Sequence, residues 1–265
     1  MGHIDNMSVS NLNASKLGVD QDLVEFEAVG GFSKTKLDCG APLPAITAST
    51  GAAAALTADT TTNCWTWADG NYVYASAEQA QTLCGPIAAA TGIDVQGDAT
   101  DNDGREIRSK MSTVKGRLNK DHYIVGTSPA FYTKCKFSIA DVSGSDDIRL
   151  GFAKDEAFND APDDLDELAA FKINAGDVKT STILNNAATV VTDLSVSDWA
   201  DGESHELEVR VSAAGAVTFY YDGTLQSSPS FSFDSGEQVV MYWWQINSSD
   251  LHGAIIWEEM EWGLQ

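Results

Sequence analysis

The stretch HELEVRVSAAGAVTFYYDG (residues 205–223) alternates apolar and polar residues on both sides of a short turn of small residues. Every second residue from Leu207 to Val211 is apolar, whereas those that alternate with them, from Glu206 to Arg210, are charged. A period of two is typical of a β-strand with one buried and one wet face. The alternation returns after the turn, so the stretch predicts an antiparallel hairpin. Because an isolated hairpin is marginally stable in water, we expect it to belong to a larger sheet.

Residues 93–265 continue in the same way, with short apolar runs separated by turn signals such as Ser143-Gly144 and Ser235-Gly236. Strands are expected at Tyr123–Gly126, Phe131–Ile139, Ile148–Ala153, Ala169–Asn174, Val178–Leu184, Thr189–Thr192, His205–Ser212, Val217–Asp222, Gln238–Ile246 and Ala254–Trp262. The one helical competitor, around Asp163–Phe171, is short enough to be a single turn. Many short strands punctuated in this way indicate an all-β antiparallel sandwich or barrel.

Residues 1–92 have a different character. The segment Ala41–Thr62 is rich in Ala, Thr, Gly and Pro and shows neither helical nor strand periodicity. Alternating aromatic residues in Cys64–Ser76 favour a short hairpin that turns at Asp69-Gly70, and Ser76–Gly85 favours one short helix. We therefore expect a long, largely irregular N-terminal arm that lies on its own sandwich or on a neighbouring subunit.

The 265-residue chain is acidic, with 39 acidic and 16 basic side chains and a formal net charge of −23. Such a surface repels nucleic acid phosphates and anionic lipid headgroups, so neither nucleic acid nor a membrane is an expected partner. The polar N-terminus predicts no secretory signal peptide, and the sequence has no apolar run of bilayer length.

The basic residues are unevenly distributed along the chain. Between residues 105 and 120 the sequence has one acid, Glu106, whereas Asp155–Glu167 is almost purely acidic. Two interpretations are open: both segments are solvated surface, or the basic segment docks on an acidic scaffold or an identical subunit. In the second case the candidate docking residues are Arg105, Arg108, Lys110, Lys115, Arg117 and Lys120.

The four cysteines, at positions 39, 64, 84 and 135, have no CxxC spacing and no neighbouring histidine, which argues against a zinc site. Cys135 falls on the apolar face of Phe131–Ile139 and is predicted to be a buried thiol. A disulfide between Cys64 and Cys84 remains open.

The stretch TDNDGRE (residues 100–106) is similar to a calcium-binding loop, with Asp101, Asp103 and Gly104 at matching places. Ala99 occupies the first ligand position, however, and no glutamate follows at the twelfth. We therefore expect an Asx-type turn, with no metal ion and no cofactor.

Two sets of residues are candidates for a glycan site. Glu259 and Glu261 alternate onto one face of the last strand, at a separation compatible with the carboxyl pair of a retaining glycosidase. Glu258 shares its face with Ile256, Met260 and Trp262, so it is expected either at the rim of that face or paired with a basic group. Consecutive aromatic residues on a strand face both ways, so Trp243 and Trp244 are expected on opposite faces, one of them in the core. Trp243 and Trp257 are the aromatic candidates for sugar stacking, with packing in the core or between subunits as the competing interpretation.

Taken together, three segments resemble the concanavalin A-like (laminin G-like) jelly-roll family: the hairpin at 205–223, the strand DIRLGF (147–152) and the closing strand AIIWEEMEWG (254–263). The resemblance spans residues 93–265 and implies a jelly-roll β-sandwich. Glucanases of this family carry an E-x-D-x-E type motif, from which Glu259-Met260-Glu261 departs by lacking the aspartate. The resemblance therefore implies no catalytic residue here.

A narrower resemblance is to virion structural proteins of tailed bacteriophages, in particular capsid decoration (cement) proteins. It rests on ATDNDGREI (99–107), RLGFAKDEAF (149–158), the hairpin and the WEEMEWG ending. It implies a non-enzymatic protein that is made in the host cytoplasm and stabilises the phage head from the capsid surface. The implied partners are the major capsid protein and copies of the chain itself, in a homo-oligomer such as a trimer. The alternative is a carbohydrate-binding or glycan-cleaving sandwich.

Overall fold

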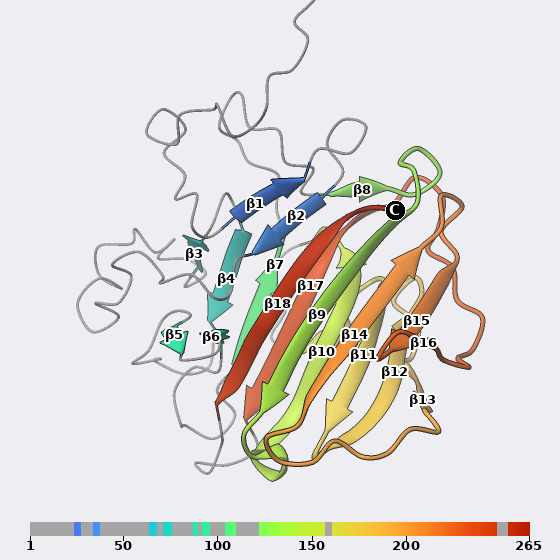
Figure 1. The fold of residues 1–265 in the computed structure, drawn as a ribbon. Coiled ribbons are helices and arrows are strands. Elements are labelled where there is room, and N and C mark those ends of the chain that lie inside the picture. The colour runs from blue at the N-terminus through green and yellow to red at the C-terminus, as the bar shows by residue number, and fades with distance from the viewer. Residues whose placement is uncertain are drawn as a thin grey trace, which may run out of the picture.

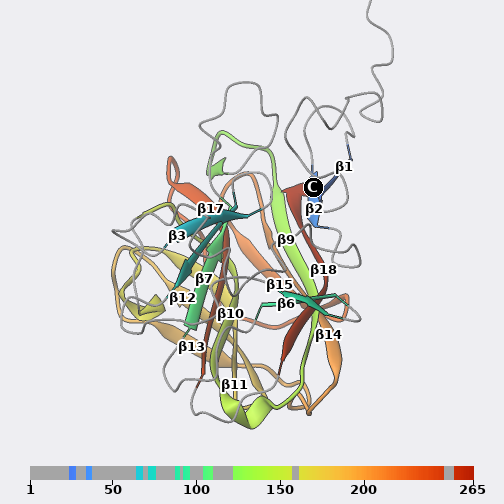
Figure 2. The ribbon, with the colours of Figure 1, turned by 90° about the vertical axis from the view of Figure 1, so that its left-hand side faces the viewer.

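The computed structural model describes residues 24–27, 34–37, 64–67, 71–75, 87–89, 92–95, 104–109, 122–156, 161–247 and 254–265. These residues form two antiparallel β-sheets that lie face to face (Figure 1, Figure 2). The all-β antiparallel jelly-roll sandwich expected from the sequence is thus confirmed. None of the described residues belongs to a helix long and apolar enough to cross a membrane.

The first sheet, sheet A, contains the hairpin at residues 205–223. Its strand order is β1-β2-β18-β9-β14-β15-β16, and β6 also pairs with β18. The main strands are β9 (Phe131–Ile139), β14 (Ser204–Val211), β15 (Val217–Tyr221), β16 (Thr224–Leu225) and β18 (Ile255–Leu264). The predicted hairpin is the β14–β15 pair, with Val209 opposite Phe219.

The second sheet, sheet B, has the order β13-β12-β11-β10-β17-β7-β4-β3, and β8 also pairs with β17. Its strands from the sandwich region are β7 (Gly104–Arg108), β8 (Tyr123–Ile124), β10 (Ser145–Lys154), β11 (Leu168–Asn174), β12 (Asp177–Ile183), β13 (Val190–Asp193) and β17 (Gln238–Asn247). The predicted helical competitor proves to be a single 3₁₀ turn, Pro162–Asp164, that ends before β11 begins.

The core lies between the two sheets. It consists of the alternate residues of each strand whose side chains point toward the other sheet. Leu207, Val209 and Val211 of β14 are fully buried there, as are alternate residues of β9, including Cys135. Aromatic rings from both sheets meet in this layer. Burial of so much apolar surface is the main source of stability for a sandwich of this kind.

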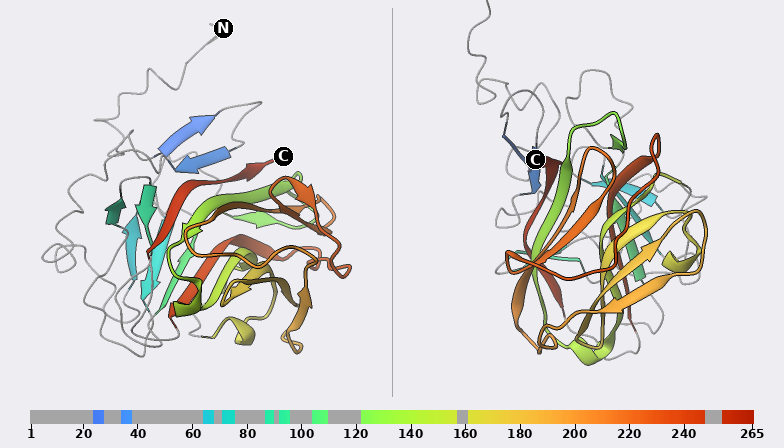
Figure 3. Two further views of the ribbon diagram at one scale, coloured as in Figure 1. Left: turned by 60° about the horizontal axis from the view of Figure 1, so that its bottom comes forward. Right: turned by 90° about the vertical axis from the view of Figure 1, so that its right-hand side faces the viewer.

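Short strands from the N-terminal part of the chain extend both sheets on one side (Figure 3). β1 (Val24–Glu27) and β2 (Lys34–Leu37) continue sheet A beside β18, where β5 (Ile87–Ala89) and β6 (Gly92–Asp94) also lie. The hairpin predicted in the aromatic segment is the pair β3 (Cys64–Trp67) and β4 (Asn71–Ala75), which continues sheet B beside β7. The predicted helix at Ser76–Gly85 and the Cys64–Cys84 disulfide lie outside the described residues and side chains. The boundary between residues 92 and 93 stays a prediction.

Candidate functional site

The two glutamates of the glycan hypothesis lie on the outer face of sheet A, as the period of two predicts. A β-bulge in β18 interrupts the pairing with β9 between Trp257 and Glu259. Trp257 is buried before the bulge and Met260 after it, so the buried side changes from odd to even positions at this point. The expectation that Glu258 faces the same way as Met260 is therefore wrong, because a bulge adds one residue to the strand. Glu258 forms an ion pair with Lys136, 2.9 Å away.

Acidic and basic residues alternate across the outer face of sheet A. Glu261 accepts a hydrogen bond from the Tyr132 hydroxyl at 2.9 Å and lies 3.6 Å from Lys134 Nζ, which also pairs with Glu206 at 3.3 Å. Partial burial and the adjacent Glu261 raise the pKa of Tyr132, so its hydroxyl remains a donor. Glu261 is therefore held by two partners and is only 6% exposed, whereas Glu259 is exposed to solvent.

On the same face the charged side of the hairpin is also engaged. Arg210 donates to both carboxylate oxygens of Glu208, at 2.8 and 2.9 Å, and its guanidinium lies 4.1 Å from the Tyr220 ring centroid. These pairs satisfy the charges within the sheet. Among the described side chains, this face thus carries a series of ion pairs and not two carboxylates that both point freely into solvent.

The two tryptophans of the glycan hypothesis do not lie on this outer face. Trp243 and Trp257 are both fully buried between the sheets, where their rings meet edge to face at 5.0 Å. The Trp243 indole N–H donates to Gln245 Oε1 at 2.8 Å, which satisfies its polar atom inside the core. The structure therefore does not bring the two tryptophans together with Glu259 and Glu261. The prediction that Trp243 and Trp244 face opposite ways is confirmed, because Trp244 lies in a second apolar cluster outside the main core.

Of the six candidate docking residues, only Arg108 has a described side chain. Arg108 is 3% exposed and forms an ion pair with the fully buried Glu106 on the outer face of sheet B. Burial raises the pKa of Glu106 to about 7, because the loss of hydration outweighs the attraction of Arg108. A buried guanidinium is not available to a partner, so the structure removes Arg108 from the docking set. Arg105 lies on β7, and its side chain is outside the described ones, as are Lys110, Lys115, Arg117 and Lys120.

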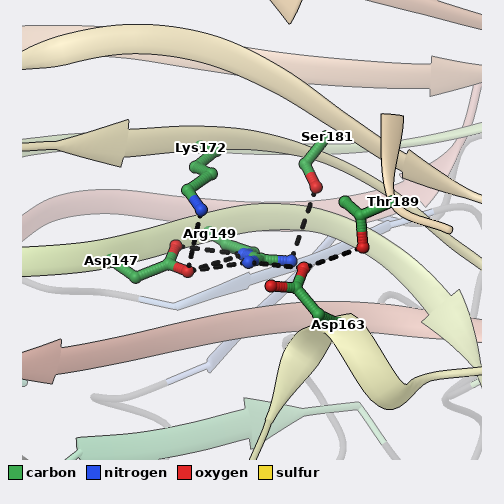
Figure 4. Close-up of polar contacts among 6 residues, drawn as sticks. All are labelled: Asp147, Arg149, Asp163, Lys172, Ser181 and Thr189. Atoms are coloured by element: carbon green, nitrogen blue, oxygen red, sulfur yellow. Dashed lines mark hydrogen bonds and ion pairs between the residues drawn. The ribbon is translucent and has the colours of Figure 1, made fainter. Parts of the chain in front are cut away.

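The most elaborate polar site in the described residues centres on Arg149 of β10, which sequence reasoning missed (Figure 4). Its guanidinium is fully buried and donates to Asp147 through Nε and Nη2, at 3.0 and 2.7 Å. Nη2 also lies 2.9 Å from Asp163, whose other neighbour is the hydroxyl of Thr189 at 2.9 Å. Lys172 adds a second cation 3.4 Å from Asp147. Although partial burial opposes ionisation, Arg149 and Thr189 hold the pKa of Asp163 below its usual value.

This cluster attaches a loop to the outer face of sheet B. Asp163 belongs to residues 161–167, hereafter the strap, in which Leu165 is buried against the second apolar cluster with Tyr242 and Trp244. Lys154 forms ion pairs with Asp166 of the strap and with Glu237, and burial raises the pKa of Glu167 to about 7. The spacing Asp-x-Arg at 147–149 was the available signal, because residues two apart on a strand share a face. The arrangement is suited to holding the strap in place and leaves the polar groups little freedom for chemistry.

A further polar contact joins the two ends of the β14–β15 hairpin. His205 Nδ1 lies 2.7 Å from Asp222 Oδ2, and its ring stacks on Tyr221 with centroids 4.9 Å apart. Within the described residues, no group of three or more His, Cys, Asp or Glu is placed to hold a metal ion. Asp101 and Asp103 of the calcium-like loop lie outside the described residues, and Gly104 begins β7.

Comparison with known proteins supports the fold and leaves the function open. No protein-family model matches the chain, and no curated protein matches its sequence. A protein of unknown function, SO2946 from Shewanella oneidensis MR-1, is similar in structure at 12% identity, with a TM-score of 0.51 over 98% of this chain and 95% of that one. At this identity the likeness shows a shared fold alone.

A lumenal domain and an alginate lyase are also among the similar structures. The metal-free exoplasmic/lumenal domain of VIP36 has 10% identity and a TM-score of 0.48, with 74% of this chain and 85% of that one covered. The alginate lyase PA1167 from Pseudomonas aeruginosa has 12% identity and a TM-score of 0.48, with 68% and 86% covered.

Proposed function

We propose that the chain is a non-enzymatic structural subunit of a tailed-phage virion that decorates the capsid and stabilises it through surface contacts. The observation that carries this proposal is the state of the charged groups on both outer sheet faces. Glu261, Glu258, Glu106 and the Arg149 cluster are each engaged by oppositely charged or hydroxyl partners within the chain. A general acid or nucleophile needs a carboxylate that can reach a substrate, whereas paired groups of this kind stabilise a rigid surface.

The N-terminal part of the chain supports the same proposal. Its short strands add to sheet edges on one side of the sandwich, which shows that this sequence can attach segments by backbone pairing. The docking hypothesis now rests on Arg105, Lys110, Lys115, Arg117 and Lys120, without Arg108. A capsid surface or a sibling subunit of acidic character is the partner that these cations would orient.

The decisive experiment adds the purified full chain to capsids that lack it and measures their disruption temperature. We expect saturable addition and a higher disruption temperature. A variant with Lys115, Arg117 and Lys120 changed to Glu should add poorly, whereas the control Thr218→Glu, at an exposed position of β15, should add normally. Equal addition by both variants would overturn the docking hypothesis, and no addition of the wild-type chain would overturn the capsid role.

The carbohydrate-binding or glycan-cleaving alternative is tested separately on a glycan array and with β-glucans. Saturable glycan binding at micromolar strength that is lost in Glu259→Gln or Glu261→Gln would replace the structural proposal. The separation of Trp243 and Trp257 from these glutamates favours the structural one.

A further inference from the structure

The exposed apolar side chains of the sandwich gather on one side. Among the described residues, the large apolar side chains that are exposed are Leu184, Val190, Val191 and Leu225, at 37%, 53%, 44% and 58%. Leu184 directly follows β12, the two valines belong to β13, and Leu225 belongs to β16. β13 ends sheet B and β16 ends sheet A on the side opposite the N-terminal strands (Figure 1). Exposed apolar residues at an open sheet edge mark a surface that another strand can cover.

The backbone of β13 is arranged to accept such a strand. Leu194 N donates to Val178 O at 3.2 Å, and Thr192 stands opposite Thr180 in the same register. Because hydrogen bonds to a neighbour alternate along an antiparallel strand, Leu194, Thr192 and Val190 turn their backbone groups toward β12. The N–H and C=O groups of Val191 and Asp193 therefore point away from the sheet.

We propose that β13 pairs antiparallel with β13 of a second copy about a two-fold axis at Val191, so that sheet B runs on through both copies. Outward-pointing residues must face one another in such a pair. A symmetric register that satisfies this condition and centres on the exposed Val191 places Val191 opposite Val191 of the second copy and Asp193 opposite Thr189. Both valines then contact at the axis, and the exposed faces of Val190 meet Thr192 of the second copy.

A second copy fits this edge better than an unrelated strand because the register is self-complementary. No two like charges oppose each other in it, which matters because like charges directly across a sheet are destabilising. The one charged residue, Asp193, is already paired with Lys179 at 3.0 Å. Two-fold pairing also covers the β13 edge of both copies at once, so sheet B cannot grow further at this edge. This dimer goes beyond the proposed function and stands whether or not the chain binds a capsid.

The register is tested with two cysteine variants of the full chain. In Val191→Cys the two Cα atoms would face each other about 5.5 Å apart, within the range of a disulfide. In Val190→Cys each cysteine would face Thr192 of the second copy and lie roughly 8 Å from its equivalent, too far for a disulfide. Mild oxidation should therefore cross-link Val191→Cys and leave Val190→Cys and the wild type monomeric on denaturing gels, with the 191–191 peptide identified by mass spectrometry. A cross-link in Val190→Cys alone, or in neither variant, would overturn the register.

Sedimentation velocity of the wild-type chain tests the dimer itself. We expect a monomer–dimer equilibrium that strengthens as salt is raised from 50 to 500 mM, because screening relieves the repulsion between two copies of charge −23. Val191→Lys places two cations at the axis and should weaken the dimer at least about tenfold, whereas Thr218→Lys, on an exposed position of β15, should not. Circular dichroism shows that each variant is folded. A wild type that stays monomeric at every salt concentration, or a dimer that Val191→Lys leaves intact, would overturn the proposal.

Discussion

Replacing Arg149 by methionine should lower the free energy of unfolding by about 3 kcal/mol. Methionine fills much of the same volume, so the loss arises from the two carboxylates that Arg149 leaves behind. Removing one partner of a buried ion pair costs roughly 3–5 kcal/mol, because the other charge remains without compensation. The lower end applies here, since Lys172 stays 3.4 Å from Asp147 and Asp163 is 54% exposed to water.

Equilibrium unfolding in urea, followed by tryptophan fluorescence at pH 7, measures this loss. The matched control is Lys179→Met on β12, whose partners Asp177 and Asp193 are 46% and 76% exposed. Water screens such exposed pairs, so their loss should cost much less than the loss of Arg149. In the double variant with Asp147→Asn the orphaned charge is removed, and part of the stability should return. Equal losses for Arg149→Met and Lys179→Met would refute the reasoning, because they would mean that water screens the buried cluster as well.

Three other predictions concern pH, the turns and the core. Burial raises the pKa of Glu106 and of Glu167 from 4.5 to about 7, so between these values both carboxylates take up a proton on folding. The stability that the two groups contribute is therefore full below about pH 4.5 and is lost as the pH rises through 7. Urea unfolding at pH 5 and pH 8 should therefore show a smaller drop in stability for Glu167→Gln than for the wild type, and an equal drop would contradict it. Gly215→Ala should destabilise the protein more than Gly223→Ala in thermal unfolding. Both glycines have positive φ, which costs about 1 kcal/mol or more for alanine. Of the two, only Gly215 would place the added Cβ 2.5 Å from a carbonyl oxygen, that of Phe233. Trp243→Ala should cost about 3–5 kcal/mol in urea unfolding, as expected for a core aromatic residue, whereas a surface tryptophan would cost less than about 1 kcal/mol.

Much of the sandwich could be predicted from the sequence because its strands have one buried face. The ten strands expected after residue 93 all occur, with ends that differ by a few residues. Leu207, Val209 and Val211 are all in the core because only one side of β14 meets it. The bulge at Glu258 was not predicted, although the sequence holds its signal, because Glu258 is the one charged residue among the even positions from Ile256 to Trp262.

The Arg149 cluster escaped the sequence interpretation for a related reason. Charged residues on a strand were expected to face solvent, yet the strap covers the outer face of sheet B and buries them. β11 contains the signal, because the run Leu168–Phe171 is apolar at every position and is buried on both faces. A strand without alternation indicates a sheet that is covered on both sides. Likewise, the basic segment looked uniform in the sequence, and only the fold separates the buried Arg108 from the rest.

The bulge in β18 also determines where this strand can change length. Trp257 before it and Met260 after it both face the core, with two glutamates between them where a regular strand would have one residue. A chain that lost either Glu258 or Glu259 would keep every buried side chain of β18 on the inner side. A deletion elsewhere in the strand would instead turn the residues beyond it to the opposite face. The closing strand can therefore become one residue shorter at this position without altering the packing of the core.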